Sequence, residues 1–180
     1  MEINPRPFEA LRNPQALEEV NPNIFRAYDV RGIYPDDLNE GAARKIALSF
    51  ASLYPQAKKI VVARDTRKSS PSLAAKIKEA LVEAGKEVFD IGIAPDPLFY
   101  FSIFHYQYDG GIMVSGSHNP KEYNGFMMHI RKAKGKISED VVGKDLEKIK
   151  KLATGEIKQK NKKKQGKVHF LNSSKDYINF

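Results

Sequence analysis

The sequence predicts an α/β fold: a three-layer α/β/α sandwich with helices on both faces of a mostly parallel, mixed sheet of four strands. Short apolar runs, typical of buried strands, alternate with longer segments whose apolar residues recur at helical spacing. The resulting order of strand, helix, strand, helix, strand favours right-handed crossovers. Such crossovers produce a parallel sheet that is covered by helices.

The strands follow from apolar runs that polar or turn residues bound. Residues 25–33 are compact and mixed in character, and we expect a strand or an ordered loop there. The runs 59–63, 87–91 and 111–114 fit buried parallel strands. Residues 126–130 form the fourth strand of the sheet, and its short connection to the third predicts antiparallel pairing.

The helices follow from apolar periodicity and from residues that start or stop a helix. In chain order, we expect helices over 38–53, ended by Pro55; over 71–84, with Ser70 as N-cap and Gly85 as its stop; over 97–106, after a Pro-containing turn; and from Ser138 through Leu152, ending at Gly155.

These elements divide the chain into four parts. Residues 1–22 are rich in proline and predict an extended arm, with at most a short helix over 14–20. Residues 23–155 form the main domain, and 156–167 form a Lys-rich linker. Residues 168–180 turn apolar again and stop after one helical turn, which is rarely stable alone. We therefore expect 168–180 to begin a truncated second domain of a longer protein.

Composition excludes several classes of function. The net charge is +8, but Arg131 to Lys167 carry 14 basic and 5 acidic residues, so the rest of the chain is close to neutral. No aromatic residue interrupts that stretch, which argues against nucleic-acid binding. The absence of cysteine excludes disulfides, thiolate zinc sites and a cysteine nucleophile. Without a long apolar span or a signal peptide, we expect a cytoplasmic protein that does not engage a membrane.

Polar segments that follow strand ends are the candidate site, because ligands of open parallel sheets bind outside the carboxyl ends of the strands. The most unusual of them is Ser115-Gly116-Ser117-His118-Asn119-Pro120. Gly116 allows a ligand to approach the backbone closely. A serine hydrolase would need Gly-x-Ser-x-Gly, which is absent here, and we expect the His118 ring to project away from the Ser117 hydroxyl.

The loop from Ser115 to Pro120 resembles the Thr/Ser-x-Ser-His-Asn-Pro active-site loop of the α-D-phosphohexomutases, the phosphoglucomutase/phosphomannomutase family. Four further segments resemble motifs of that family in the expected order. They are Phe25 to Ile33, similar to its N-terminal signature; Arg64-Asp65-Thr66-Arg67; Pro95-Asp96-Pro97, where the family usually has Pro-Thr-Pro; and Tyr123-Asn124-Gly125-Phe126. The resemblance covers residues 24–155 and implies the family's N-terminal domain I.

The resemblance implies an isomerase of carbohydrate metabolism that interconverts hexose 1-phosphates and 6-phosphates through a phosphoserine at Ser117. It implies Mg²⁺, bound partly through the phosphate on Ser117, and a hexose bisphosphate as activator. The remaining metal ligands belong to an Asp-Gly-Asp-x-Asp-Arg loop of a second domain, which this sequence lacks. The implied partners are phosphorylated hexoses and domains II to IV of the same protein, and we expect the fragment alone to be inactive.

The expected site residues fall into three groups. The catalytic candidates are Ser117, Arg31 and His118, the last as a hydrogen bonder that orients the loop. The candidates for substrate or phosphate contact are Tyr28, Ser115, Asn119, Lys121, Asn124 and His129. Arg64, Asp65 and Arg67 are expected to brace the serine loop. From the residues alone, Arg31 would be a surface ion pair with Asp29 or Asp65.

One departure from the family pattern bears on catalysis. The family usually has lysine where this chain has Met127, and that lysine is thought to act as general acid and base. A thioether has no proton to give. His129 shares a strand face with Met127 at about 7 Å and is one substitute; Lys121 is another. The alternative function is a non-catalytic relative that only binds phosphosugars.

Overall fold

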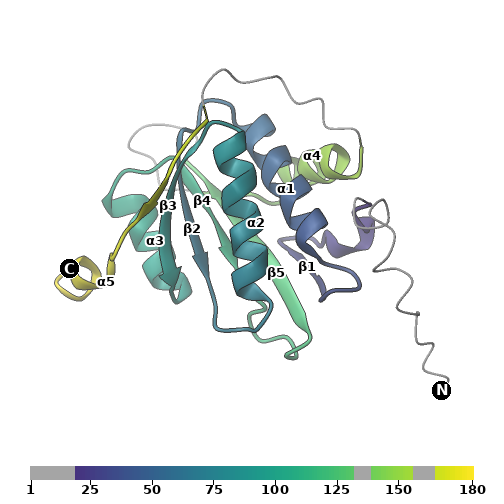
Figure 1. Ribbon diagram of the computed structural model, residues 1–180, viewed down its shortest axis with the longest axis horizontal. Helices are drawn as coiled ribbons and strands as arrows, with labels where there is room; N and C mark the ends of the chain where they lie inside the picture. Colours follow the sequence, from purple (N-terminus) through teal and green to yellow (C-terminus); the bar gives the residue numbers. More distant parts are fainter. Residues whose placement is uncertain (1–18, 132–138, 156–164) are drawn as a thin grey trace.

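The computed structural model describes residues 19–131, 139–155 and 165–180, and in it one mixed sheet carries helices on both faces (Figure 1). The strands are β1 (Val30–Ile33), β2 (Lys59–Arg64), β3 (Glu87–Ile93), β4 (Gly110–Val114), β5 (Tyr123–Ile130), β6 (Glu139–Asp140) and β7 (Val168–Phe170). The helices are η2 (Pro22–Ile24), α1 (Glu40–Leu53), α2 (Ser70–Glu83), α3 (Asp96–His105), α4 (Gly143–Thr154) and α5 (Ser174–Ile178).

The sheet confirms the α/β fold but has more strands than expected. Its order is β1-β5-β4-β2-β3-β7, with β6 paired to β5, which makes seven strands. Strands β4, β2, β3 and β7 are parallel, and β5 is antiparallel to β4, as its short connection predicted. The expected count of four was wrong because β6 and β7 are too short to produce a periodic signal and because 25–33 was left open between strand and loop.

Alternate residues of β2 divide the core into two layers. Ile60 and Val62 face the side that α1, α2 and α4 cover, whereas Val61 and Ala63 face α3. On the α3 side, Gly111 leaves room for the Phe99 ring, since a Cβ there would lie 2.6 Å from a ring carbon. The three-layer arrangement is therefore built from the strand alternation itself.

The last expected helix begins later than its sequence pattern indicated. Ser138 lies outside the described residues, and Glu139 and Asp140 pair with β5 instead of entering a helix. Helix α4 starts at Gly143, whose φ is +53°, so the chain turns there before it can become helical.

The C-terminal segment packs on the same sheet. The Val88 N–H donates to the Lys167 carbonyl at 2.8 Å, which places β7 beside β3. On α5, the Tyr177 ring lies against Phe101 of α3, with ring centroids 5.2 Å apart. The assignment of 168–180 to a second domain remains a prediction.

Two other assignments fall mostly or partly outside the described residues. The N-terminal arm and its short helix over 14–20 are described only from residue 19, where Val20 is buried in the core. Of the Lys-rich linker, only 165–167 are described.

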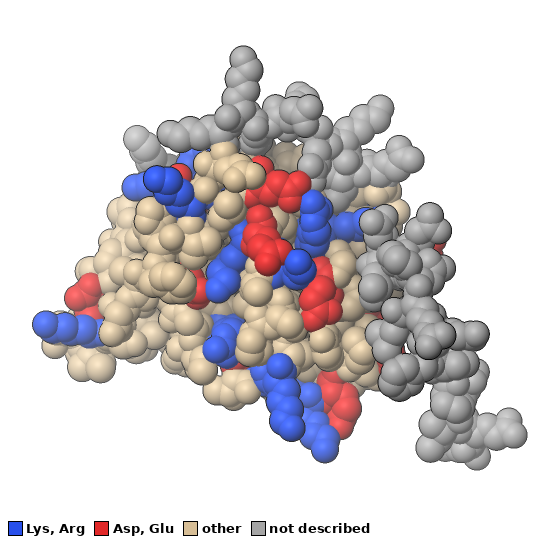
Figure 2. All heavy atoms as spheres, in the orientation of Figure 1, with Lys and Arg blue, Asp and Glu red and all other residues tan. Residues whose placement is uncertain are grey.

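Basic and acidic side chains are interspersed on the face that Figure 2 presents, over α1 and α2. Pairs such as Arg44–Glu83, with 2.7 Å between nitrogen and oxygen, account for part of this mixture. The described helices include none that is both long enough and apolar enough to cross a membrane.

Backbone hydrogen bonds bring together the loops at the carboxyl ends of the parallel strands. The Asp65 N–H donates to the Val114 carbonyl at 2.9 Å, and the Ala94 N–H donates to the Arg64 carbonyl at 3.1 Å. The loops after β2, β3 and β4 thus meet at one edge of the sheet. The serine loop, residues 115–122, lies at this edge and leads into β5.

Candidate active site

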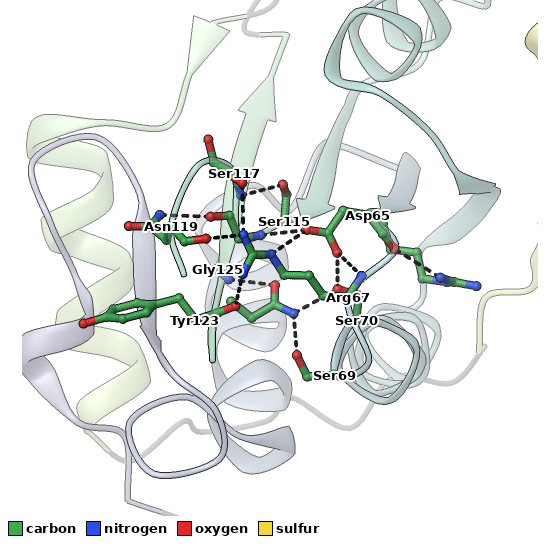
Figure 3. Close-up of polar contacts among 12 residues, drawn as sticks. Asp65, Arg67, Ser69, Ser70, Ser115, Ser117, Asn119, Tyr123 and Gly125 are labelled. Carbon is green, nitrogen blue, oxygen red and sulfur yellow. Dashed lines mark hydrogen bonds and ion pairs between the residues drawn. The ribbon is translucent and has the colours of Figure 1, made fainter. Parts of the chain in front are cut away.

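Ser117 lies at the exposed tip of the serine loop in an unusual backbone conformation. Its φ is +50°, in the left-handed region that costs an L-residue about 1–2 kcal/mol. The Ser117 N–H donates to the Ser115 Oγ at 3.0 Å, and in Figure 3 the Ser117 side chain extends away from the centre of the loop. The loop therefore presents the hydroxyl outward on a turn that other groups must hold.

His118 lies close to that hydroxyl, contrary to the expectation from the sequence. Its Nδ1 is 3.1 Å from the Ser117 Oγ. Adjacent side chains point to opposite sides in extended backbone, and the expectation rested on that rule. The positive φ at Ser117 breaks the alternation, so the ring and the hydroxyl lie within hydrogen-bond distance.

The guanidinium of Arg67 occupies the centre of the serine loop and binds its carbonyl oxygens (Figure 3). Its Nη2 donates to the carbonyls of Ser117 at 3.0 Å and Asn119 at 2.6 Å. Its Nη1 donates to the carbonyl of Tyr123 at 3.0 Å and also to that of Pro120. Because a planar guanidinium offers five donors in fixed directions, it can gather these carbonyls around itself. This arrangement supports the expected bracing role of Arg67.

Gly116 is the residue that admits Arg67. A Cβ at this position would lie 2.1 Å from Arg67 Nε and 2.2 Å from its Cζ. The sequence suggested that the missing side chain makes room for a ligand. In the structure, the group that approaches the Gly116 backbone is the guanidinium.

Asp65 connects the arginine to the loop. Its Oδ2 accepts the Gly116 N–H at 2.9 Å and lies 3.2 Å from Arg67 Nε. Its Oδ1 accepts the Arg67 N–H at 3.0 Å and the Ser70 hydroxyl. Burial acts to raise the pKa of Asp65, but the hydrogen bonds from Ser70, Gly116 and Arg67, together with the Arg67 charge, hold that pKa below its ordinary value. Asp65 is therefore an ionised acceptor at neutral pH.

Asn124 is fully buried, and its side chain hydrogen-bonds to other residues of the protein. Its Nδ2 donates to the Ser69 Oγ at 2.8 Å and to the Ser70 Oγ at 2.9 Å, and its Oδ1 accepts the Gly125 N–H at 2.8 Å. These contacts do not support the phosphate contact that we expected of Asn124. They identify Ser69 and Ser70 as site residues that sequence reasoning missed. The sequence pattern indicated Ser70 as the N-cap of α2, whereas in the structure Ser69 is the N-cap and Ser70 is the first residue of the helix.

Of the other loop residues, Asn119 and Ser115 form hydrogen bonds within the site, whereas Lys121 is exposed. Asn119 donates from Nδ2 to the Gly116 carbonyl at 2.9 Å, and the Ser115 N–H donates to the Gly125 carbonyl at 3.0 Å. The Lys121 side chain is 93% exposed, with its Nζ 4.0 Å from a Glu122 oxygen. Lys121 is thus available to a ligand, whereas Asn119 and Ser115 also shape the loop.

Strand pairing places Arg31 and Arg64 beside the ends of the loop, whereas for Tyr28 the structure shows only that it is exposed. Arg31 is paired with Gly125 across β1 and β5, and its Nε is 3.8 Å from Asp29 Oδ1, as the simplest reading of the sequence indicated. Tyr28 is 79% exposed. Arg64 Nη1 donates to the Asp65 carbonyl at 3.1 Å. Strand pairing therefore places Arg31 beside the base of the serine loop.

His129 lies toward the opposite end of the β4–β5 hairpin. It pairs with Gly111, whereas Phe126 pairs with Val114 at the start of the serine loop, about 10 Å away at the rise of a strand. His129 is 4% exposed, and its Nε2 is 2.6 Å from Asp140 Oδ1. Burial lowers the pKa of His129, and the Asp140 charge opposes that shift. The structure does not bring His129 to the site, although it shares the α3 face with Met127 as predicted.

The described residues do not form a metal site by themselves. They contain no group of three or more histidine and acidic side chains that could hold a metal ion. The carboxylate of Asp65 bonds directly to the serine loop, and its two oxygens already accept hydrogen bonds from Gly116, Arg67 and Ser70.

Comparison with known proteins gives consistent results. The family model described as "Phosphoglucomutase/phosphomannomutase, alpha/beta/alpha domain I" matches residues 22–157. "Phosphohexose mutases" of Xanthomonas campestris pv. campestris are 40% identical over 116 residues, which cover 64% of this chain and 25% of that protein. A "phosphomannomutase" of Klebsiella pneumoniae is 38% identical over 125 residues, which cover 69% of this chain and 78% of that protein.

A solved structure shares both the fold and part of the sequence. The X-ray structure of a phosphoglucomutase/phosphomannomutase family protein from Burkholderia thailandensis superposes with a TM-score of 0.74 at 30% identity. The match covers 88% of this chain and 35% of that one. The chain thus spans about a quarter of the Xanthomonas relatives and about a third of the Burkholderia protein.

Proposed function

Because the chain belongs to the phosphoglucomutase/phosphomannomutase family, we propose that it provides the phosphoryl-carrying serine of a hexose-phosphate mutase, and that this serine is Ser117. The observation that carries the proposal is the exposed Ser117 hydroxyl, presented by a loop that Arg67 and Asp65 hold from within. The relatives are named phosphomannomutases and phosphohexose mutases, which supports hexose phosphates as substrates.

The proposed chemistry requires little from the serine loop except position and charge. The bond between phosphorus and the Ser117 oxygen breaks as a hexose hydroxyl bonds to that phosphorus, and the proton that the hydroxyl loses balances the one that the released serine oxygen gains. In the second step the Ser117 hydroxyl takes the other phosphoryl group of the bisphosphate, and the proton moves back to the sugar oxygen that is released. Phosphoryl transfer has a loose, anionic transition state, so fixed geometry and cations do most of the work. We assign the phosphate oxygens to the partly exposed Arg31 and the exposed Lys121, and we propose Tyr28 and Ser115 as further contacts of the substrate.

His118 is the group best placed to handle a proton at Ser117. Its Nδ1 lies 3.1 Å from the Ser117 Oγ, a distance that fits a hydrogen bond when the serine is not phosphorylated. We propose that His118 orients the free hydroxyl to receive the returning phosphoryl group.

The rest of the protein's activity is a wider proposal, because the chain spans only part of its relatives. We propose Mg²⁺ as cofactor, with Ser117 contributing through its phosphate and other ligands coming from outside the described residues. A hexose bisphosphate activator, domains II to IV as partners and a cytoplasmic location belong to the same proposal. On this view the 180 residues alone do not turn over a sugar phosphate.

Met127 favours a second candidate function, a phosphosugar-binding relative without catalysis. Met127 packs among apolar side chains on the α3 face of the sheet and carries no proton, and His129 lies too far along β5 to replace a lysine. Reversion to the usual residue separates the two functions. If Met127→Lys raises a mutase rate at least about tenfold, the natural protein is impaired at this step; an unchanged rate assigns the proton transfer elsewhere.

The test of the proposal uses the full-length gene product with Mg²⁺, a hexose bisphosphate and glucose or mannose 1-phosphate. We expect formation of the 6-phosphate and a phosphate group on Ser117 by mass spectrometry. Ser117→Ala should lower the rate by at least about 10³-fold, while Ser72→Ala should leave it unchanged. A Ser117→Ala protein with full activity would overturn the proposal.

A further inference from the structure

A chain of hydrogen bonds connects β5 to the serine loop through the start of α2. It runs from Asn124 to Ser70, from Ser70 to Asp65, and from Asp65 to Gly116 and Arg67 (Figure 3). Asn124 and Ser70 are fully buried, so neither reaches a ligand from solvent. Resting on the proposed function, we propose that Asn124 and Ser70 are positioning residues for Ser117 that act by fixing the direction of these hydrogen bonds.

The direction follows from what each group can donate. The Asn124 Nδ2 donates both of its protons, to the oxygens of Ser69 and Ser70. The orientation of the amide is set because its Oδ1 accepts the Gly125 N–H at 2.8 Å. The Ser70 oxygen therefore accepts a hydrogen bond from Asn124, and the Ser70 hydroxyl donates its own hydrogen bond to Asp65 Oδ1.

The consequence for Asp65 is a fixed rotation of its carboxylate. With Oδ1 held by Ser70 and by the Arg67 N–H, Oδ2 points at the Gly116 N–H and at Arg67 Nε. Arg67 in turn holds the carbonyl of Ser117, whose φ of +50° needs support from its surroundings. A change at Asn124 or Ser70 therefore acts on Ser117 from a distance, through Asp65.

Three variants test this direction in the full-length gene product. Ser70→Ala removes the proton that Asp65 receives, and Ser70→Thr retains it. Asn124→Asp keeps the shape but turns a donor into an acceptor, which draws the Ser70 proton away from Asp65. Ser72→Ala is the matched control, because Ser72 lies in the first turn of the same helix and its hydroxyl interacts with the Ser69 carbonyl at 3.1 Å and with Tyr34, not with Asn124, Ser70 or Asp65.

The first measurement is amide hydrogen exchange, which does not depend on any activity. We expect Ser70→Ala and Asn124→Asp to speed exchange at Gly116 and Ser117 at least about tenfold, without change in the core of α1. Ser70→Thr and Ser72→Ala should match the natural protein. Unchanged exchange in the serine loop would overturn the inference, as would equal acceleration in α1, which would indicate a general loss of stability.

The second measurement is mutase kinetics on the same proteins. We expect kcat to fall about 10–100-fold for Ser70→Ala and Asn124→Asp with little change in KM, because the loop is misplaced while the substrate contacts remain. Faster loop exchange with an unchanged kcat would overturn the positioning role. If the natural protein has no mutase activity but its variants still show faster loop exchange, the proposed function is overturned. The chain of hydrogen bonds from Asn124 to Arg67 would then still be what holds the loop.

Discussion

An ionisable group lies beside each end of the β4–β5 hairpin, and the two groups have opposite surroundings: Asp65 is partly buried and His129 is buried. At the serine loop, Asp65 receives hydrogen bonds from Ser70, Gly116 and Arg67, and its pKa is held below its ordinary value despite burial. Toward the other end, His129 lies edge-on to the Tyr100 ring with Asp140 as its charged neighbour, and burial lowers its pKa. At neutral pH the Asp65 carboxylate therefore stays charged, whereas burial favours the neutral form of His129.

This difference indicates which end has a carboxylate that several hydrogen bonds fix in place. Desolvation disfavours the charged form at both ends, so the hydrogen-bond partners and charges around each group decide the outcome. A charge that several donors fix in place can set the geometry of a loop for phosphoryl transfer. A neutral histidine between aromatic rings behaves as part of the core. The following predictions test whether the contrast holds.

Replacement of Arg67 should have the largest effect. Arg67→Ala leaves Asp65 without its cation and several loop carbonyls without a donor, so we expect a loss of about 3 kcal/mol in the free energy of unfolding and a loss of Ser117 phosphorylation. Urea unfolding measures the first effect and mass spectrometry the second.

Two further variants define the cause. Arg67→Lys keeps the charge but loses the fork of donors, so it should recover less than half of the loss. Arg64→Ala, which removes one hydrogen bond to the Asp65 carbonyl, should cost less than about 1 kcal/mol. A lysine variant as stable and active as the natural protein would show that charge alone organises the loop.

Gly116→Ala should come next, at about 2 kcal/mol, because its Cβ would meet the Arg67 guanidinium. The end of an arginine side chain normally moves aside, but here four carbonyls hold it. Gly92→Ala is the control, since Gly92 has φ +70° and open space around it and should cost only the conformational penalty of about 1 kcal/mol.

A double-mutant cycle isolates this contact. In the Arg67→Ala background the clash is gone, so Gly116→Ala should lower the free energy of unfolding much less there. We expect an interaction energy between the two positions of at least about 1 kcal/mol, as is usual for residues in contact. Additive effects would mean that Gly116 is required for a reason other than Arg67.

The contrast between the two ends also explains what the sequence could and could not predict. Helical periodicity located α1 and α2, and continuous apolar runs located α3 and the central strands. The serine loop was found by its unusual residues and by resemblance to a family. The position of His118 depended on one backbone angle, and the roles of Ser70 and Asn124 depended on contacts between distant segments. No local pattern encodes either of these.

The His129 end should produce a pH dependence of smaller size. Since the folded pKa of His129 is lowered, its contribution to stability is complete above the ordinary histidine pKa of 6.5 and declines as pH falls below it, when the unfolded chain takes up a proton that the folded protein resists. The slope from one proton is at most about 1.4 kcal/mol per pH unit. His129→Gln should flatten unfolding free energy between pH 6.5 and the lower folded pKa.

Asp140→Asn sharpens the same test. It removes the charge that opposes the shift, so the decline should continue to lower pH than in the natural protein. The Tyr100 ring also contacts His129, but a tyrosine hydroxyl is neutral in this pH range, and burial with the charges of Asp140 and Asp96 raises the pKa of Tyr100 further. If His129→Gln retained the full pH slope, the neutral histidine would not be its source.

The smallest effect should come from Asp96, a second carboxylate at the serine-loop edge. It is the first residue of α3, and among the described residues no group donates a hydrogen bond to its carboxylate. Burial raises the pKa of Asp96, and the charge of Asp65 adds to the shift.

The sign at Asp96 is therefore opposite to that at Asp65. A raised folded pKa gives stability that is present below the unfolded pKa and is lost as pH rises through the folded value, so Asp96→Asn should stabilise the protein at pH 7 but not at pH 3. The gain should be only a few tenths of a kcal/mol, because water screens a partly exposed carboxylate and the N-terminus of α3 favours its charge. Asp65→Asn, measured in the same pH series of urea unfolding, should destabilise at pH 7 and lose that effect in acid. If both variants shifted stability in the same direction at pH 7, hydrogen-bond donors would not be what separates the two carboxylates, and the contrast between the two ends of the hairpin would need another cause.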